Sequence, residues 1–114
     1  MQSQFQVLDE AELTDFFSVG PLDRTVEDGY WCYEVSDERG VKLRFSFNIY
    51  EMSVQTALSV GGAAAATVSH EGAERMLVRD GKLRCEFSTG GDRTTLTLEC
   101  DRTLSVVWST LRTR

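Results

Sequence analysis

The sequence predicts a small, mainly β protein: an antiparallel meander forming a sandwich or a partly open barrel, with one short N-terminal helix. Three observations support this fold class. Between residues 30 and 111 most segments alternate apolar and polar residues, as strands with one buried face do. Gly and Asp recur between these segments, as they do in tight turns. The one convincing helix start lies before residue 20.

Length and composition indicate a single domain spanning residues 1–114. A chain of 114 residues with 41% hydrophobic and 26% charged residues is ordinary for a globular protein. No apolar run approaches the roughly 20 residues of a membrane span. The three cysteines form no CxxC pair, and residues 1–5 lack the features of a signal peptide. We therefore expect a cytoplasmic protein with reduced thiols.

The helix is predicted near residues 9–18, packed on one face of the sheet. Asp9 and Glu12 have the spacing of a capping box, and Gly20-Pro21 ends the helical pattern. The apolar stripe consists of Leu13, Phe16 and Phe17. Such a stripe must pack against another element.

After a polar connection (residues 23–29), two strands form a predicted hairpin across the turn at residues 37–40. Gly40 suits the left-handed position of a three-residue loop. The predicted pairs are Val35 with Val41, Tyr33 with Leu43, and Trp31 with Phe45. This register places the large apolar residues on one face.

Residues 54–60 suggest the next strand, which ends at Gly61-Gly62. The four alanines that follow precede β-branched Thr67 and Val68, which favours a strand over a helix for residues 64–70. We interpret the alanines as room for a bulky neighbour.

Two further hairpins are predicted independently and agree with each other. The first turns at Asp80-Gly81, a strong two-residue hairpin signal, and the second turns at residues 89–92. The predicted pairs are Val78 with Leu83, Met76 with Cys85, Leu98 with Leu83, and Leu96 with Cys85. A final strand carries Leu104, Val106 and Trp108 on one face.

The sequence shows no catalytic, metal-binding or cofactor-binding constellation, so we predict that the protein is not an enzyme. His70 is expected to be a half-buried, hydrogen-bonded residue, because alternation places it on the inward side near a strand end. Its neighbours Ser69 and Glu71 point to the opposite face, which argues against a Ser-His-acid constellation. Three cysteines and one histidine lack the spacing of a zinc site. Gly61-Gly62 and Gly90-Gly91 lack the Lys and the helix of a phosphate loop.

Charge is distributed unevenly along the chain, whose net charge is −6. Residues 1–60 hold eleven Asp and Glu against four Lys and Arg, whereas residues 61–114 hold seven against eight. Nucleic acids and anionic membranes are therefore poor partners, and a basic protein would be attracted. The plainer interpretation is that this charge serves only solubility.

A protein-binding role is the function that remains. The candidate partner-binding residues are the acidic Asp23, Glu27, Asp28, Asp37 and Glu38, in or beside loops, and the aromatic Tyr30 and Tyr50. We expect the acids to speed association with a basic partner and the tyrosines to act as anchors. Glu10, Glu12 and Asp15 of the helix add charge of the same sign.

A short amphipathic helix followed by a β meander, with the segment at residues 47–54 between two strands, resembles small bacterial toxin-immunity proteins. The resemblance covers most of the chain without a diagnostic motif, so it transfers no functional residue. It implies a stoichiometric inhibitor of a toxin, often a basic nuclease, encoded beside it.

Two alternatives stay open. A small-molecule-binding β barrel would use the aromatic residues to line a cavity. An oligomeric structural or accessory protein would bury a strand edge or an apolar patch against its own copy. Outward-facing Leu77, Val107 and Leu111 favour self-association, so a homodimer is included among the expected partners.

Overall fold

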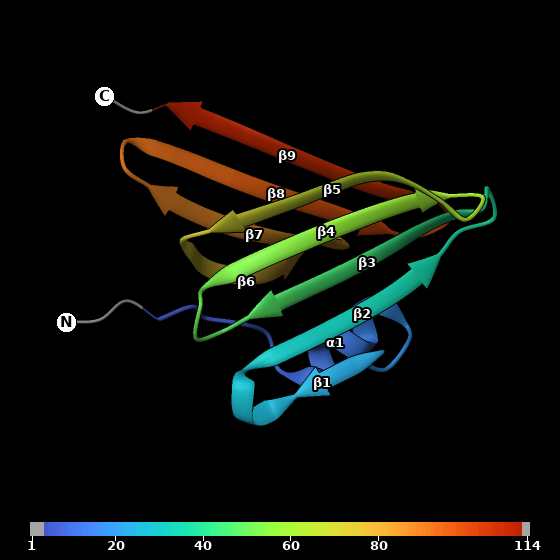
Figure 1. Cartoon of the computed structure of the whole chain (residues 1–114), viewed down its shortest axis with the longest axis horizontal. Helices are drawn as coiled ribbons and strands as arrows, with labels where there is room; N and C mark the ends of the chain where they lie inside the picture. Colours follow the sequence, from blue (N-terminus) through green and yellow to red (C-terminus); the bar gives the residue numbers. More distant parts are fainter. Residues whose placement is uncertain (1–3, 113–114) are drawn as a thin grey trace.

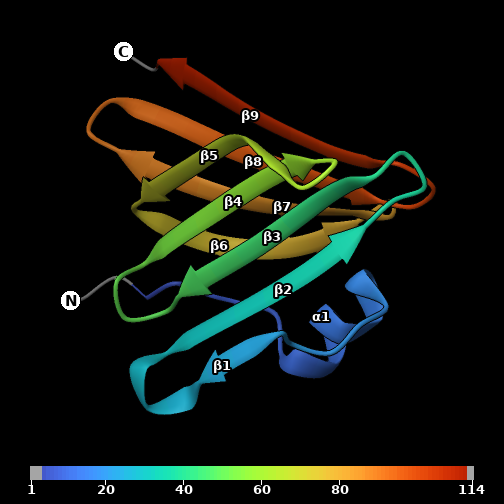
Figure 2. The same ribbon diagram turned by 45° about the vertical axis from the view of Figure 1, so that its right-hand side comes forward.

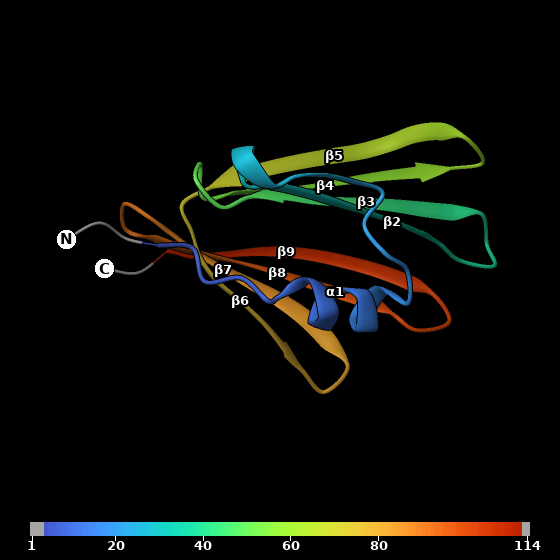
Figure 3. The same ribbon diagram turned by 90° about the horizontal axis from the view of Figure 1, so that it is seen from below.

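The computed structural model describes residues 4–112 and shows two antiparallel sheets packed face to face with one α-helix (Figure 1). The five-stranded sheet contains β1 (Asp23–Thr25), β2 (Tyr30–Ser36), β3 (Val41–Asn48), β4 (Ser53–Val60) and β5 (Ala63–Glu71) in that order. The four-stranded sheet contains β6 (Ala73–Arg79), β7 (Lys82–Thr89), β8 (Asp92–Cys100) and β9 (Leu104–Arg112). The mainly β prediction is confirmed. The sheets form two open layers (Figure 3), so the arrangement is a sandwich and the barrel alternative is wrong.

The helix α1 (Glu10–Phe17) covers one open side of the sandwich, beside β1 and β2 (Figure 2). Its Phe17 ring lies 5.0 Å from the ring of Tyr33 and 5.6 Å from that of Phe45. Burial of Phe17 and Leu13 fastens the helix to the core. The capping box is confirmed: Glu12 N–H donates to Asp9 at 2.8 Å, and Asp9 N–H donates to Glu12 at 3.2 Å. Within residues 4–112, no helix is long and apolar enough to cross a membrane.

The predicted register of the β2–β3 hairpin is wrong by two residues. Val35 pairs with Leu43, Tyr33 with Phe45, and Trp31 with Phe47. A shift of two keeps every side chain on its face, so the apolar pattern could not distinguish the two registers. The hydrogen bonds of the loop at residues 37–40 select the observed register. Gly40 is left-handed (φ 82°) as expected, and Asp37 N–H donates to the Val41 carbonyl at 2.9 Å.

Two local expectations fail elsewhere in the five-stranded sheet. The predicted polar connection at residues 23–29 holds the short strand β1 and a 3₁₀ turn (η1, Val26–Asp28). The predicted strand at residues 64–70 is confirmed as part of β5, but residues 63–69 are all exposed. No bulky neighbour fills the space beside these alanines, because β5 is the last strand of its sheet.

The four-stranded sheet matches its predicted pairs. Asp80 (φ 55°) and Gly81 (φ 75°) form the two-residue turn, and all four predicted pairings occur. Cys85 is fully buried between its cross-strand neighbours Met76 and Leu96. Together with the inward residues of β2 and β3, these side chains form one continuous core.

Candidate partner-binding surface

The structure separates the predicted partner-binding residues into two groups at opposite ends of β2. Five of them lie around the start of β2: Asp23, Glu27, Asp28, Tyr30 and Tyr50. Asp37 and Glu38 lie in the β2–β3 turn. The seven residues of β2 separate the groups by roughly 20 Å. A single continuous surface built from all seven residues is therefore not formed.

The group at the start of β2, which we call the η1 end, is held together by hydrogen bonds between the Asn48 side chain and the backbone. Asn48 donates to the Asp28 carbonyl at 3.0 Å and accepts the N–H of Tyr50 at 3.0 Å. Gly29 is left-handed, and a Cβ there would lie 2.8 Å from the Tyr50 ring, so only glycine fits. The Tyr50 side chain is 68% exposed, as an anchor for a partner would be.

Asp37 does not belong to a free surface, because its side chain is only 2% exposed. Its carboxylate accepts the N–H of Leu104 at 2.9 Å and two side-chain N–H groups of Arg39 at 2.8 and 3.0 Å. It also accepts the N–H groups of Arg39 and Val41. These hydrogen bonds lower the pKa of Asp37 to about 2. The largest contribution comes from the Leu104 N–H, and smaller ones come from the Arg39 side chain and the backbone N–H groups of the turn. The Asp37 side chain thus joins the β2–β3 turn to β9.

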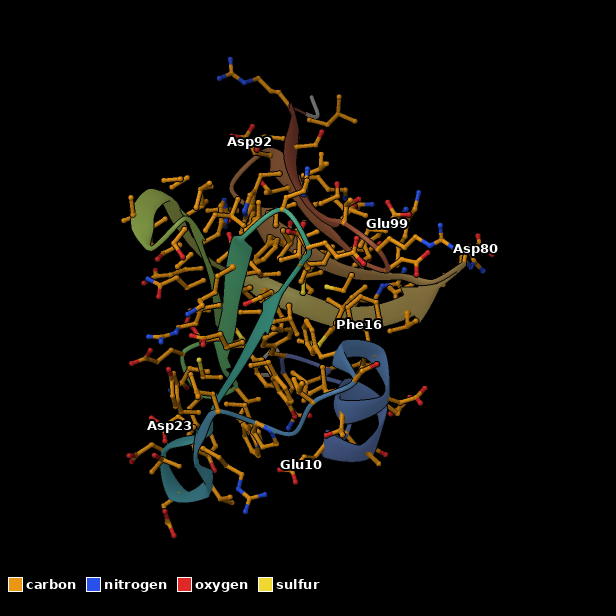
Figure 4. The ribbon with its side chains drawn as sticks, turned by 90° about the vertical axis from the view of Figure 1, so that its right-hand side faces the viewer. Glu10, Phe16, Asp23, Asp80, Asp92 and Glu99 are labelled. Atoms are coloured by element: carbon orange, nitrogen blue, oxygen red, sulfur yellow. The ribbon has the colours of Figure 1, made fainter. Side chains whose placement is uncertain are left out.

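A surface cavity of about 550 Å³, which the sequence analysis did not identify, lies between α1 and the end of the four-stranded sheet. Five carboxylates surround it: Glu12 and Asp15 from α1, Asp80 from the β6–β7 turn, Glu99 from β8, and Asp101 after β8. We call this cavity the acidic pocket. Figure 4 shows Phe16, Asp80 and Glu99 around this end of the molecule.

The acidic pocket combines negative charge with an apolar floor. Phe16, Val78, Gly81 and Cys100 complete its lining, and no Lys or Arg of the described residues contributes to it. Among the described residues, none of the five carboxylates forms an ion pair within the chain. Lys82 stands across from Glu99 in the sheet and is the nearest cation by register. The pocket therefore suits a cationic side chain whose methylene stem packs on the floor.

The carboxylates come from segments far apart in sequence, which explains why sequence analysis missed the acidic pocket. Asp80 was recognised only as a turn residue, and Glu99 only as an outward strand residue. The helix acids were noted for their sign alone. Pairing of β7 with β8 and docking of α1 on the core bring them together.

The remaining polar side chains with possible chemistry are used in packing. The His70 ring stacks on Trp108 at 6.1 Å and contacts the tilted ring of Phe87 at 4.9 Å. Its Nδ1 lies 2.7 Å from the Glu71 carbonyl oxygen. The half-buried, hydrogen-bonded state predicted for His70 is confirmed. Burial raises the pKa of Cys100, in the pocket floor, to about 11, so this thiol stays neutral. Within residues 4–112, no three His, Cys, Asp or Glu residues are placed to hold a metal ion.

Comparison with known proteins gives one informative match. No family model and no curated protein matches the sequence. Among solved structures, a chain of the "Contact-dependent growth inhibition toxin - immunity protein complex from Klebsiella pneumoniae 342" aligns with a TM-score of 0.88 at 17% identity. The alignment covers 96% of this chain and 100% of that chain. The two share a fold, which confirms the resemblance to proteins of toxin–immunity systems.

Proposed function

We propose that this protein is an immunity-type inhibitor that neutralises a cognate bacterial toxin by direct contact, without catalysis, in the cytoplasm. The observation that carries the proposal is the fold shared with a chain of the Klebsiella pneumoniae complex along 96% of the sequence. The acidic pocket gives the proposal a chemical basis, because none of its carboxylates forms an ion pair with a Lys or Arg of residues 4–112. The expected partner is a toxin with a basic surface.

The acidic pocket is proposed to bind a Lys or Arg side chain of the toxin. The cation would lie among Asp15, Asp80 and Glu99, and its stem would pack on Phe16 and Val78. A contact that removes water from both the charge and the stem slows dissociation, as buried anchors do. Glu38, in the exposed β2–β3 turn, adds negative charge at the same end of the molecule.

The η1 end is proposed to act earlier, during encounter. Asp23, Glu27 and Asp28 are exposed and would attract a basic surface over several ångströms. Charges at the rim of an interface change mainly the association rate and its salt dependence. Exposed Tyr50 beside them would contribute apolar contact.

Co-expression with the toxin encoded by the neighbouring gene tests the function itself. Cells that produce this toxin should survive only when the chain is also produced. Failure to protect, or growth arrest caused by this chain expressed alone, would contradict the proposal, and the second outcome would identify the chain as a toxin.

Two charge-matched variants separate the proposed roles of the two surfaces. The pocket variant Asp15→Asn/Asp80→Asn/Glu99→Gln/Asp101→Asn leaves Glu12 and its capping box intact, and Asn tolerates the left-handed backbone at position 80. The η1-end variant is Asp23→Asn/Glu27→Gln/Asp28→Asn/Glu51→Gln. Glu51 is an exposed acid next to Tyr50, and its backbone N–H also donates to the Asn48 side chain, at 3.0 Å. Binding kinetics with the purified toxin should show roughly a hundredfold faster dissociation for the pocket variant. The η1-end variant should show slower association and a weaker dependence on salt.

The reverse assignment, with dissociation affected only by the η1-end variant, would remove the acidic pocket from the proposal. It would leave the inhibitor function standing, provided that co-expression protects the cells.

A further inference from the structure

The four edges of the two sheets differ in how well they are protected against pairing with another strand. The β6 edge is bridged by Gln6, whose N–H donates to the Glu74 carbonyl at 3.0 Å and whose carbonyl accepts the Met76 N–H at 2.8 Å. The β1 edge has only three residues. The β5 edge carries a register shift opposite Leu58 and Ser59. Short or irregular edges resist addition of a strand.

Strand β9 has none of these protections beyond its first residue, Leu104, whose N–H and carbonyl are bonded to Asp37 and Arg39 of the β2–β3 turn. It pairs with β8 in an unbroken register from Leu104 to Arg112. Residues 104–111 contain no charged residue and no proline. Val107 and Leu111 lie on the outward face, 52% and 66% exposed. An unprotected, apolar edge of this length is a template for strand pairing.

We propose that β9 binds β9 of a second copy, antiparallel about a two-fold axis at Ser109, so that the two four-stranded sheets become one. In an antiparallel pair, residues whose numbers have a constant sum stand opposite each other. A centre at Ser109 places Val107 opposite Leu111 of the second copy twice, once on each side of the axis. No other centre pairs both exposed apolar residues with each other.

Charge also favours a second copy as the occupant of this edge. Residues 104–111 offer a basic or an acidic partner no opposite charge, whereas an identical strand needs none. In the proposed register Arg112 stands opposite Val106 of the second copy, so the two arginines do not meet directly. Like charges in directly opposite positions would destabilise the pair.

The proposed dimer leaves the acidic pocket accessible. Leu111 pairs with Arg93 near the start of β8, whereas Glu99 and Cys100 of the pocket lie at the other end of that strand. Figure 4 shows the same separation between Asp92, at the start of β8, and Glu99. Two toxin molecules could therefore bind one dimer.

Analytical ultracentrifugation of the full chain without toxin tests the dimer independently of the proposed function. From about 10 to about 500 µM the unaltered chain should pass from monomer to dimer. Val107→Lys/Leu111→Lys places like charges opposite each other twice and should weaken the dimer roughly tenfold or more. Val107→Lys/Leu111→Glu places opposite charges together in the proposed register only, and should retain the dimer.

A matched control, Leu22→Lys/Val26→Lys, removes two side chains of similar exposure (54% and 55%) elsewhere and should leave the dimer intact. Thr67→Lys, on the β5 edge, should also have no effect. The proposal is overturned if the unaltered chain stays monomeric throughout, if the Lys/Glu variant dissociates as readily as the Lys/Lys variant, or if Thr67→Lys is the disruptive change.

Discussion

Asp37 and the carboxylates of the acidic pocket lie at the same end of the molecule but have opposite surroundings. Asp37 is 2% exposed and accepts hydrogen bonds from three backbone N–H groups and from Arg39. Asp15, Asp80, Glu99 and Asp101 are exposed and form no ion pair with any residue that the structure describes. An acid with internal partners stabilises the fold, whereas an acid without them is free to bind another molecule.

The largest effect on stability is expected at Asp37. Asp37→Ala would leave the buried N–H of Leu104 without its acceptor and detach the β2–β3 turn from β9. The thermal unfolding midpoint should fall more than for any other substitution discussed below. Glu38→Ala, an exposed acid in the same turn, is the control and should unfold at nearly the same temperature as the unaltered chain. Equal midpoints for the two variants would refute the structural role of Asp37.

The contribution of Asp37 should also depend on pH. Its pKa is about 2 in the folded chain, below the ordinary value of roughly 4. A carboxyl group whose pKa is lowered by folding stabilises the folded chain. This stabilisation is fully present above the pKa that the group has in the unfolded chain, and it is lost as the pH falls through the pKa that the group has in the folded chain. The difference in midpoint between the unaltered chain and Asp37→Asn should therefore be constant from about pH 7 to 5 and shrink between about pH 4 and 2. A difference that does not shrink would contradict the ionised, bonded state of Asp37.

His70 has internal partners like Asp37 but is only half-buried, so its removal should cost less. His70→Gln should lower the free energy of unfolding by about 1 kcal/mol, because a hydrogen bond and part of the ring contact with Phe87 and Trp108 are lost. Urea unfolding measures this difference. A folded variant that no longer protects cells would instead give His70 a direct role in function.

Tyr33 shows the opposite case, a fully buried polar group without a partner. Its hydroxyl faces Thr14 of α1, but no group of the described residues lies in hydrogen-bonding geometry with it. Tyr33→Phe keeps the ring that stacks on Phe17 and should change the free energy of unfolding by less than about 1 kcal/mol, towards greater stability. A loss well beyond this in urea unfolding would show that the hydroxyl does have a partner.

Sequence patterns predicted the fold better than they predicted the candidate site. Alternation and turn chemistry are local, so α1 and the pairs of the four-stranded sheet followed from them. The β2–β3 register did not, because a shift of two residues conserves the pattern and only the contacts of Asp37 distinguish the alternatives. The three residues of β1 are too few to show alternation.

The acidic pocket could not be predicted because it depends on tertiary structure. Asp15, Asp80 and Glu99 become neighbours only once α1 docks on the sandwich and the sheet positions both turns. Conversely, Asp37 was predicted to be free because loop acids usually are. Its contact with Leu104, 67 residues later, leaves no sign in either local sequence.

The most direct test of the contrast between bonded and free acids is to measure stability and toxin affinity in the same protein. For the pocket variant Asp15→Asn/Asp80→Asn/Glu99→Gln/Asp101→Asn, the free energy of unfolding should stay within about 1 kcal/mol of the unaltered chain or rise. Its affinity for the toxin encoded by the neighbouring gene should fall roughly a hundredfold. A variant that binds this toxin with unchanged affinity, or that loses affinity only because it unfolds, would contradict the account.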